Sequence, residues 1–166
     1  MKNLFLTLVI LLITTNPLKA VDVTANPILT VHTLDGKNFN LKEQLGKVVI
    51  VNFWAKWCSI CRQEIQALEE IYQKYKTQGL EVIAINIDQK SQRKKVAEIT
   101  ASFSYSSAMF YEIQEGNFEE PEIIPTSYII DQSGKIAAKI IGKNEDDFDK
   151  RNLEEIVQSL LTSHHP

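Results

Sequence analysis

The chain has 166 residues, of which 44% are hydrophobic and 23% charged, and it contains two cysteines. This length fits one domain, and the composition is that of an ordinary soluble core, which excludes a disordered or collagen-like chain. The formal net charge is −3, so we do not expect a nucleic-acid-binding protein.

The first twenty residues differ from the rest of the chain. Lys2 precedes an apolar run from Leu4 to Ile13, and Ala20 closes the segment. This order is typical of a secretory signal peptide, and the run is shorter than the roughly 20 residues of a membrane-spanning helix. We expect a signal peptide over residues 1–20. An uncleaved membrane anchor is the alternative, because Leu18 is a poor residue two positions before the cut. Both interpretations put the domain in the periplasm or another extracytoplasmic compartment.

The remainder predicts one α/β domain over residues 28–162, between a linker at 21–27 and a tail at 163–166. Continuous apolar runs predict strands buried on both faces, and apolar residues at three- and four-residue steps predict helices. In chain order, the expected elements are hairpin strands at 28–33 and 39–41, a central strand at Val48–Trp54, a helix over 61–75, a strand at 80–87, a helix over 91–103 capped by Ser91, a strand at 107–113, a hairpin of Thr126–Ile130 and Ile136–Ile141, and a helix that includes 153–160. The alternation of strands and helices implies parallel pairing at the centre.

Cys58 and Cys61 are two residues apart and can be half of a metal site, a structural disulfide or a redox pair. A structural zinc site needs about four ligands, and only His32, His164 and His165 remain to supply them. A disulfide across so short a loop would constrain the unfolded chain little. These arguments favour the redox pair and predict no metal.

The position of Cys58 supports redox chemistry, because it lies where the central strand ends and a helix begins. Free N–H groups and the dipole at a helix N-terminus stabilise a thiolate and lower the pKa of the thiol. Cys58 is therefore the expected nucleophile. Cys61, one turn further on the apolar face, is expected to be shielded and to resolve the mixed disulfide.

Three separated segments carry a resemblance to a known family. Residues 49–64, which include Trp57-Cys58-Ser59-Ile60-Cys61, resemble the active-site segment of the thioredoxin superfamily, and most closely that of exported thiol:disulfide interchange proteins of the TlpA, ResA and DsbE type. Residues 35–41 resemble their N-terminal hairpin, and residues 124–131 their cis-proline segment. The resemblance implies a thioredoxin-like fold, with a mixed central sheet flanked by helices and an N-terminal β-hairpin.

The same resemblance implies a substrate-binding surface. Pro125 is expected to be cis and to stand opposite Cys58, with the backbone of Ile124 offered to an incoming substrate strand. Thr126 follows in the same segment. Trp57, directly before the first cysteine, is expected to cover part of this surface.

Two polar residues near the cysteines are also implied by the resemblance. Asn52 stands where cytoplasmic thioredoxins carry a buried aspartate, and a neutral amide cannot take up a proton. Glu64 matches a glutamate of the reducing members, where it tunes the cysteine pKa values and assists proton transfer. The alternative for Glu64 is an ordinary solvated acid on a helix.

Together these observations predict an exported thiol:disulfide oxidoreductase with the catalytic residues Cys58, Cys61 and Glu64. No cofactor is required, and the expected substrates are exported proteins with cysteines, apocytochrome c among them. A reductant is favoured over an oxidant or isomerase, and a membrane thiol reductase of the DsbD or CcdA type would then supply electrons. A copper-binding chaperone that uses the same two thiolates is the alternative from another class, and a peroxidase is less favoured.

Overall fold

A central strand, β3 (Val48–Trp54), leads to the two cysteines and is buried along its whole length. The computed structural model describes residues 26–142 and 150–163. β3 pairs in parallel with β4 (Leu80–Asn86) and in antiparallel fashion with β6 (Thr126–Ile130). The other strands are β1 (Leu29–Thr33), β2 (Asn38–Asn40), β5 (Ser106–Gly116) and β7 (Ile136–Ile141). They form one mixed sheet in the order β2-β1-β5-β4-β3-β6-β7.

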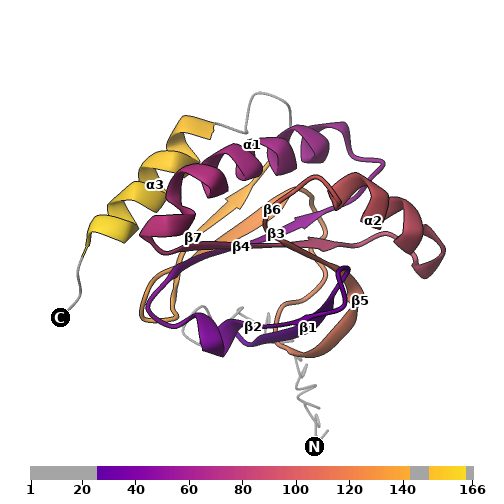
Figure 1. Cartoon of the computed structure of the whole chain (residues 1–166), viewed down its shortest axis with the longest axis horizontal. Helices are drawn as coiled ribbons and strands as arrows, with labels where there is room; N and C mark the ends of the chain where they lie inside the picture. Colours follow the sequence, from indigo (N-terminus) through magenta and orange to yellow (C-terminus); the bar gives the residue numbers. More distant parts are fainter. Residues whose placement is uncertain (1–25, 143–149, 164–166) are drawn as a thin grey trace, which may run out of the picture.

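In the described part of the chain, three helices cover one face of this sheet. α1 (Ser59–Tyr75) and α3 (Lys150–Thr162) lie side by side over it, and α2 (Arg93–Thr100) lies toward one end (Figure 1). The β1–β2 hairpin and part of β5 curve beneath the opposite face (Figure 1). The sheet therefore carries a hydrophobic core on each side, one under the helices and one over the hairpin.

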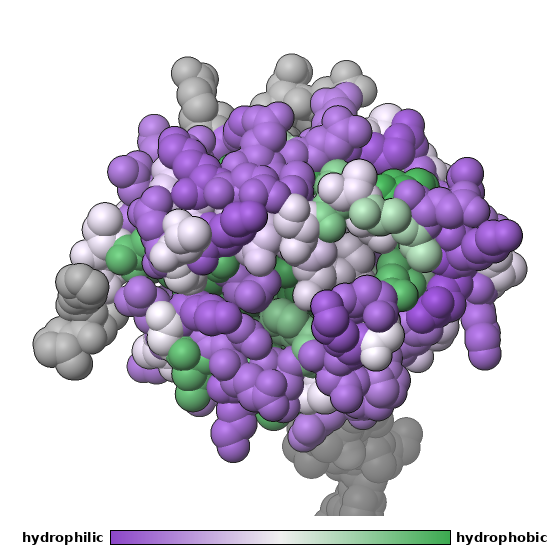
Figure 2. Space-filling view, viewed as in Figure 1, coloured by the Kyte–Doolittle hydropathy of each residue, from purple (hydrophilic) through white to green (hydrophobic). Residues whose placement is uncertain are grey.

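The burial of apolar residues in these two cores leaves a largely polar exterior. On the face seen in Figure 2, hydrophilic residues predominate and the apolar residues form small separate patches. Between α1 and α3, Lys74 forms an ion pair with Glu154, and Lys150 forms another with Glu70. Surface pairs of this kind contribute little to stability individually, so the packing of apolar side chains against the sheet holds the helices.

Most of the predicted elements are confirmed, including the mixed sheet flanked by helices and the N-terminal hairpin. The prediction for 91–103 was wrong in detail, because Ser91 lies in a 3₁₀ turn (Lys90–Gln92) and does not cap α2. α2 ends at Thr100, and Phe103 leaves the helix to stack on Tyr105 at 5.2 Å between ring centroids. Aromatic stacking outside the helix replaces the expected helical contact.

β5 is longer than the predicted strand at 107–113. Its first residues pair with β4, whereas its second half pairs with β1 as far as Gly116. This second half is mostly exposed or half-buried. A strand that is not buried needs no continuous run of apolar residues, so the sequence gives no sign of it. The extension depends on backbone pairing with a distant strand, which local sequence patterns do not reveal.

The predicted signal peptide or anchor lies outside the described residues, as does most of the predicted linker. Within residues 26–142 and 150–163, no helix is both long enough and apolar enough to cross a membrane.

Candidate active site

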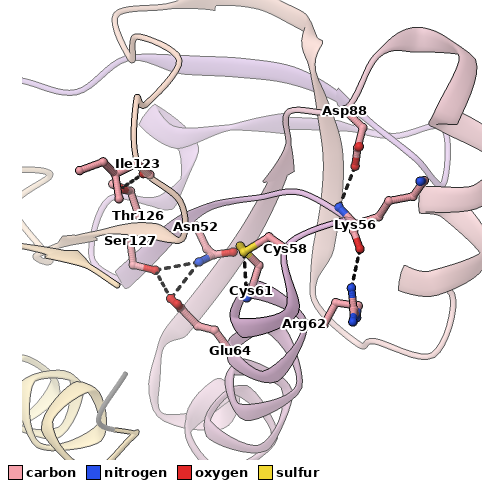
Figure 3. The surroundings of a disulfide bond; sticks show 10 residues. All are labelled: Asn52, Lys56, Cys58, Cys61, Arg62, Glu64, Asp88, Ile123, Thr126 and Ser127. Atoms are coloured by element: carbon pink, nitrogen blue, oxygen red, sulfur yellow. Dashed lines mark hydrogen bonds between the residues drawn. A yellow bond between two sulfur atoms is a disulfide. The ribbon is translucent and has the colours of Figure 1, made fainter. Parts of the chain in front are cut away.

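Cys58 and Cys61 form a disulfide at the N-terminus of α1 (Figure 3). Cys58 is the N-cap residue, and its Sγ accepts a hydrogen bond of 3.2 Å from the backbone N–H of Cys61. The same arrangement would stabilise a negative charge on this sulfur after reduction. Cys58 is 8% exposed and Cys61 is fully buried, so Cys58 is the sulfur that an incoming group can reach.

The backbone just before Cys58 is held from two sides. The N–H of Lys56 donates to Oδ2 of Asp88 at 2.7 Å, and Nη1 of Arg62 donates to the carbonyl of Lys56 at 2.7 Å. The Lys56 side chain extends away from Cys58 in Figure 3. These two bonds hold the segment that carries Trp57 and Cys58.

Glu64 lies in the interior and is not a solvated helix acid. It is 2% exposed, and its Oε1 accepts hydrogen bonds from Nδ2 of Asn52 at 2.9 Å and from Oγ of Ser127 at 2.7 Å (Figure 3). Burial raises the pKa of Glu64 from 4.5 to about 7, although both hydrogen bonds lower it. A carboxyl group with this pKa can both accept and release a proton near neutral pH.

The bond between Ile124 and Pro125 is cis, as predicted. The carbonyl of Pro125 accepts a hydrogen bond of 2.9 Å from the N–H of Gly142. A Cβ atom on Gly142 would lie 2.9 Å from Cγ of Pro125 and 3.7 Å from Cδ1 of Ile60. Pro125 and Ile60, which lies between the cysteines, thus approach the same point, and a larger residue at Gly142 would intrude there.

The other residues predicted to bind substrate differ in their exposure. Trp57 is 67% exposed, whereas Ile124 is half-buried and Thr126 is buried. The Thr126 hydroxyl donates to the carbonyl of Ile123 at 2.7 Å. This bond links the two ends of the segment 123–126. Among the described residues, none forms a hydrogen bond with the backbone of Ile124. Within the described part of the chain, its N–H and C=O groups are therefore open to pairing with another chain. The binding roles of these residues stay predictions.

Sequence reasoning missed three residues that organise the site: Asp88, Arg62 and Ser127. Asp88 directly follows the predicted strand at 80–87, at the end where parallel strands place their functional side chains, and this was the available signal. Ser127 lies two residues after Pro125, but its role depends on the register between β6 and β3, which no local pattern contains.

The described residues offer the two cysteines no further side chains that could complete a metal site. In the portion of the chain that the structure describes, no cluster of three or more histidine, cysteine, aspartate or glutamate side chains is placed to hold a metal ion. The two sulfurs are joined to each other, so they would first have to be reduced to bind a soft cation such as Cu(I).

The chemistry available here is the opening and closing of one sulfur–sulfur bond, which makes the protein a thiol:disulfide oxidoreductase. The comparisons agree. The chain belongs to the AhpC/TSA family, whose model matches residues 19–139.

Named relatives and solved structures are similar over most of the chain. The thiol-disulfide oxidoreductase ResA of Bacillus cereus is 35% identical over 136 residues, which cover 81% of this chain and 75% of that protein. ResA of Geobacillus thermodenitrificans is 30% identical over 139 residues, covering 82% and 78%. A thiol:disulfide interchange protein of the thioredoxin family from Chlorobium tepidum is 28% identical, with a TM-score of 0.64 and coverage of 81% and 94%. The thioredoxin-like fold predicted for this chain is thereby confirmed.

Proposed function

We propose that this protein is an exported reductant that opens disulfides in other exported proteins, apocytochrome c among its substrates. The observation that carries the proposal is the buried Glu64 carboxyl, with a pKa of about 7, close to a helix-capping Cys58 (Figure 3). A reductant must deliver two protons with two electrons, and a group that titrates near neutral pH can assist that transfer.

The reaction would proceed in two exchanges. The Cys58 thiolate attacks one sulfur of the substrate disulfide, the substrate bond breaks, and the other substrate sulfur leaves as a thiolate that is then protonated. Cys61, deprotonated with the help of Glu64, next attacks Sγ of Cys58 and releases the second substrate thiol. The substrate gains two electrons and two protons, and the protein is left with the disulfide that the structure contains.

The free backbone groups of Ile124 support docking of the substrate as an extended strand. A strand paired there would lie across Pro125, and the exposed Trp57 ring offers it an apolar contact. Main-chain pairing of this kind supplies affinity with little demand on substrate sequence.

An external donor has to restore the dithiol, because the chain contains no third cysteine. A membrane thiol reductase of the DsbD or CcdA type fits this need. The secretory character of residues 1–20 supports an extracytoplasmic location, with or without an N-terminal tether to the membrane. Such compartments permit disulfides to persist, so a maintained dithiol there requires such a donor.

The reduction potential of the Cys58–Cys61 pair tests the direction of electron flow. A reductant should have a potential near or below that of thioredoxin, about −270 mV. A value near the roughly −120 mV of a strong oxidase would overturn the assignment and leave an oxidant in its place.

The Glu64→Gln variant tests the part played by the carboxyl group. A negative charge near the cysteines raises the pKa of the Cys58 thiol, so its removal should lower that pKa and make the pair more oxidising. Titration of thiolate absorbance in the reduced protein measures the effect. Identical curves for the variant and the wild type would remove Glu64 from the mechanism.

A further inference from the structure

A closed triangle of hydrogen bonds lies beneath the disulfide and joins three elements. Asn52 is on β3, Glu64 on α1 and Ser127 on β6, two residues after the cis-proline (Figure 3). The register of the sheet pairs Asn52 directly with Ser127. Their neighbours at two-residue steps, Ile50 and Ile129, belong to the core under the helices. Both polar side chains therefore face α1.

The bonds of the triangle converge on one oxygen of Glu64. Oε1 accepts from Nδ2 of Asn52 and from Oγ of Ser127, and Nδ2 of Asn52 also donates to Oγ of Ser127 at 2.9 Å. Among the described residues, no hydrogen bond reaches Oε2 of Glu64. Each of the three side chains is at most 2% exposed, so water does not compensate for a lost partner.

We propose that Asn52 and Ser127 are positioning residues that hold Oε1 of Glu64 and leave Oε2 as the oxygen that takes up and releases the proton. The cis-proline strand, through Ser127, thereby sets the protonation of the carboxyl group under the cysteines. The use of this proton in disulfide exchange rests on the proposed function, whereas its place on Glu64 does not.

The donor and acceptor inventory explains the choice of oxygen. The amide nitrogen of Asn52 can only donate a hydrogen bond. A proton on Oε1 of Glu64 would therefore point at the N–H hydrogen of Asn52 and would have no acceptor there. Ser127 already accepts a bond from Asn52 and donates its own hydrogen to Oε1. A proton on Oε2 leaves all three bonds in place.

The charge state of Glu64 is a balance between burial and these two bonds. Burial favours the neutral acid and is the larger effect, while hydrogen bonds donated to the carboxylate favour the charged form. Removal of either donor should therefore raise the pKa of Glu64 further. The Ser127 donor is the better one to test, because a hydroxyl can be deleted without a change of shape.

Other titratable groups face Glu64 from α1 and from the segment before β5. The Tyr105 hydroxyl donates to the carbonyl of Ile65 at 2.8 Å. Burial raises the pKa of Tyr105, and the charges of Glu69 and Glu64 add to this effect. Cys58 and Cys61 carry no charge while they form the disulfide. Among the described residues, no lysine, arginine or other acid contributes to the pKa shift of Glu64. The oxidised protein is therefore the state in which to measure it.

The variants Ser127→Thr and Ser127→Val form a matched pair, since their side chains have the same shape and differ by one hydroxyl group. The pKa of Glu64 can be followed in the oxidised protein by carbon NMR of its carboxyl group. We expect Ser127→Thr to keep the wild-type midpoint and Ser127→Val to raise it by roughly one pH unit or more, from the loss of a hydrogen bond to a charged group. Equal midpoints in the two variants would overturn the proposal, since packing alone would then explain Ser127.

The pH profile of disulfide exchange separates this inference from the proposed function. We expect Ser127→Val to move the profile in an otherwise wild-type protein and to leave it unmoved when combined with Glu64→Gln. A profile that moves equally in both backgrounds would contradict the proposal. If the wild-type protein exchanges no disulfides, the proposed function fails, and the NMR midpoints still decide whether Ser127 controls the Glu64 proton. Where Ser127→Val does not fold, Ser127→Ala replaces it with the same expected outcomes.

Discussion

At the scale of single residues, burial moves the pKa of the Glu64 carboxyl group into the neutral range. Its carboxyl group titrates near 4.5 when exposed and near 7 in the folded protein, because burial disfavours the charge. Such a group stabilises the fold in its protonated form, and this contribution decreases as the pH rises through the folded-state pKa. Between pH 4.5 and 7 the native state binds the proton and the unfolded state does not.

We therefore expect the free energy of unfolding of the oxidised protein to fall by on the order of 3 kcal/mol between about pH 4.5 and pH 7 through Glu64 alone, since one pKa unit corresponds to about 1.4 kcal/mol. Glu64→Gln should remove this slope. Urea unfolding of both proteins at several pH values measures the difference. The same slope in both would mean that Glu64 is charged throughout this range.

The two cysteines should respond differently to substitution. Because Cys58, the less buried of the two cysteines, is expected to attack, Cys58→Ser should abolish exchange, while Cys61→Ser should accumulate mixed disulfides with substrate. Non-reducing electrophoresis with a disulfide-containing partner measures both. Faster alkylation of Cys61 than of Cys58 in the reduced wild-type protein would reverse the assignment.

At the scale of elements, the site is built where the ends of several segments meet. β3 delivers the chain to Cys58, the loop after β4 supplies Asp88, and α1 supplies Arg62. Asp88 is only 7% exposed, and its backbone N–H donates to Oδ1 of Asn86 at 2.9 Å. The segment before Cys58 therefore depends on β4 as well as on its own strand.

Asp88→Ala should release the Lys56 amide, which donates to that carboxylate. We expect a loss of about 1–3 kcal/mol in stability, the usual effect of leaving a buried donor without its acceptor, and faster hydrogen exchange at the Lys56 N–H. Asp88→Asn is the control, because its amide oxygen can still accept the bond. Unchanged exchange at Lys56 in Asp88→Ala would show that Arg62 alone fixes the segment.

At the scale of the whole molecule, the sheet separates two cores and brings the redox site to one edge. Both cysteines belong to the core on the helix-covered side, and Glu64 contacts Asn52 and Ser127 on the same side. Trp57 is 67% exposed and Cys58 is 8% exposed, whereas Cys61 is fully buried. A partner protein can reach Cys58 while Glu64, which is 2% exposed, lies in the interior.

The proposed export of the chain predicts a processed N-terminus. We expect mature protein recovered from the extracytoplasmic fraction of a bacterial host to begin at Val21, since the small side chain of Ala20 suits the signal-peptide cut. Mass spectrometry of the intact protein identifies the end. An intact N-terminus in the membrane fraction would support the uncleaved anchor, and an intact soluble protein in the cytosol would contradict export.

Local patterns were sufficient for the order of the elements, the cysteine pair and the position of Cys58 at a helix start, because each depends on residues close together in the chain. A continuous apolar run predicts a buried strand wherever it pairs, and the family resemblance of residues 124–131 led to the cis bond at Pro125.

Only the tertiary structure decided the environment of Glu64. The sequence left two alternatives for Glu64, a residue that tunes the cysteines and an ordinary solvated acid on a helix. It could not choose between them, because the surroundings of a helical side chain depend on what packs against it. The register between β3 and β6 places Asn52 opposite Ser127. The packing of α1 on the sheet then buries Glu64 against these two side chains, which both donate hydrogen bonds to it. These contacts join residues 12, 63 and 75 positions apart, and the protonation of a buried group depends on such contacts more than on its neighbours in sequence.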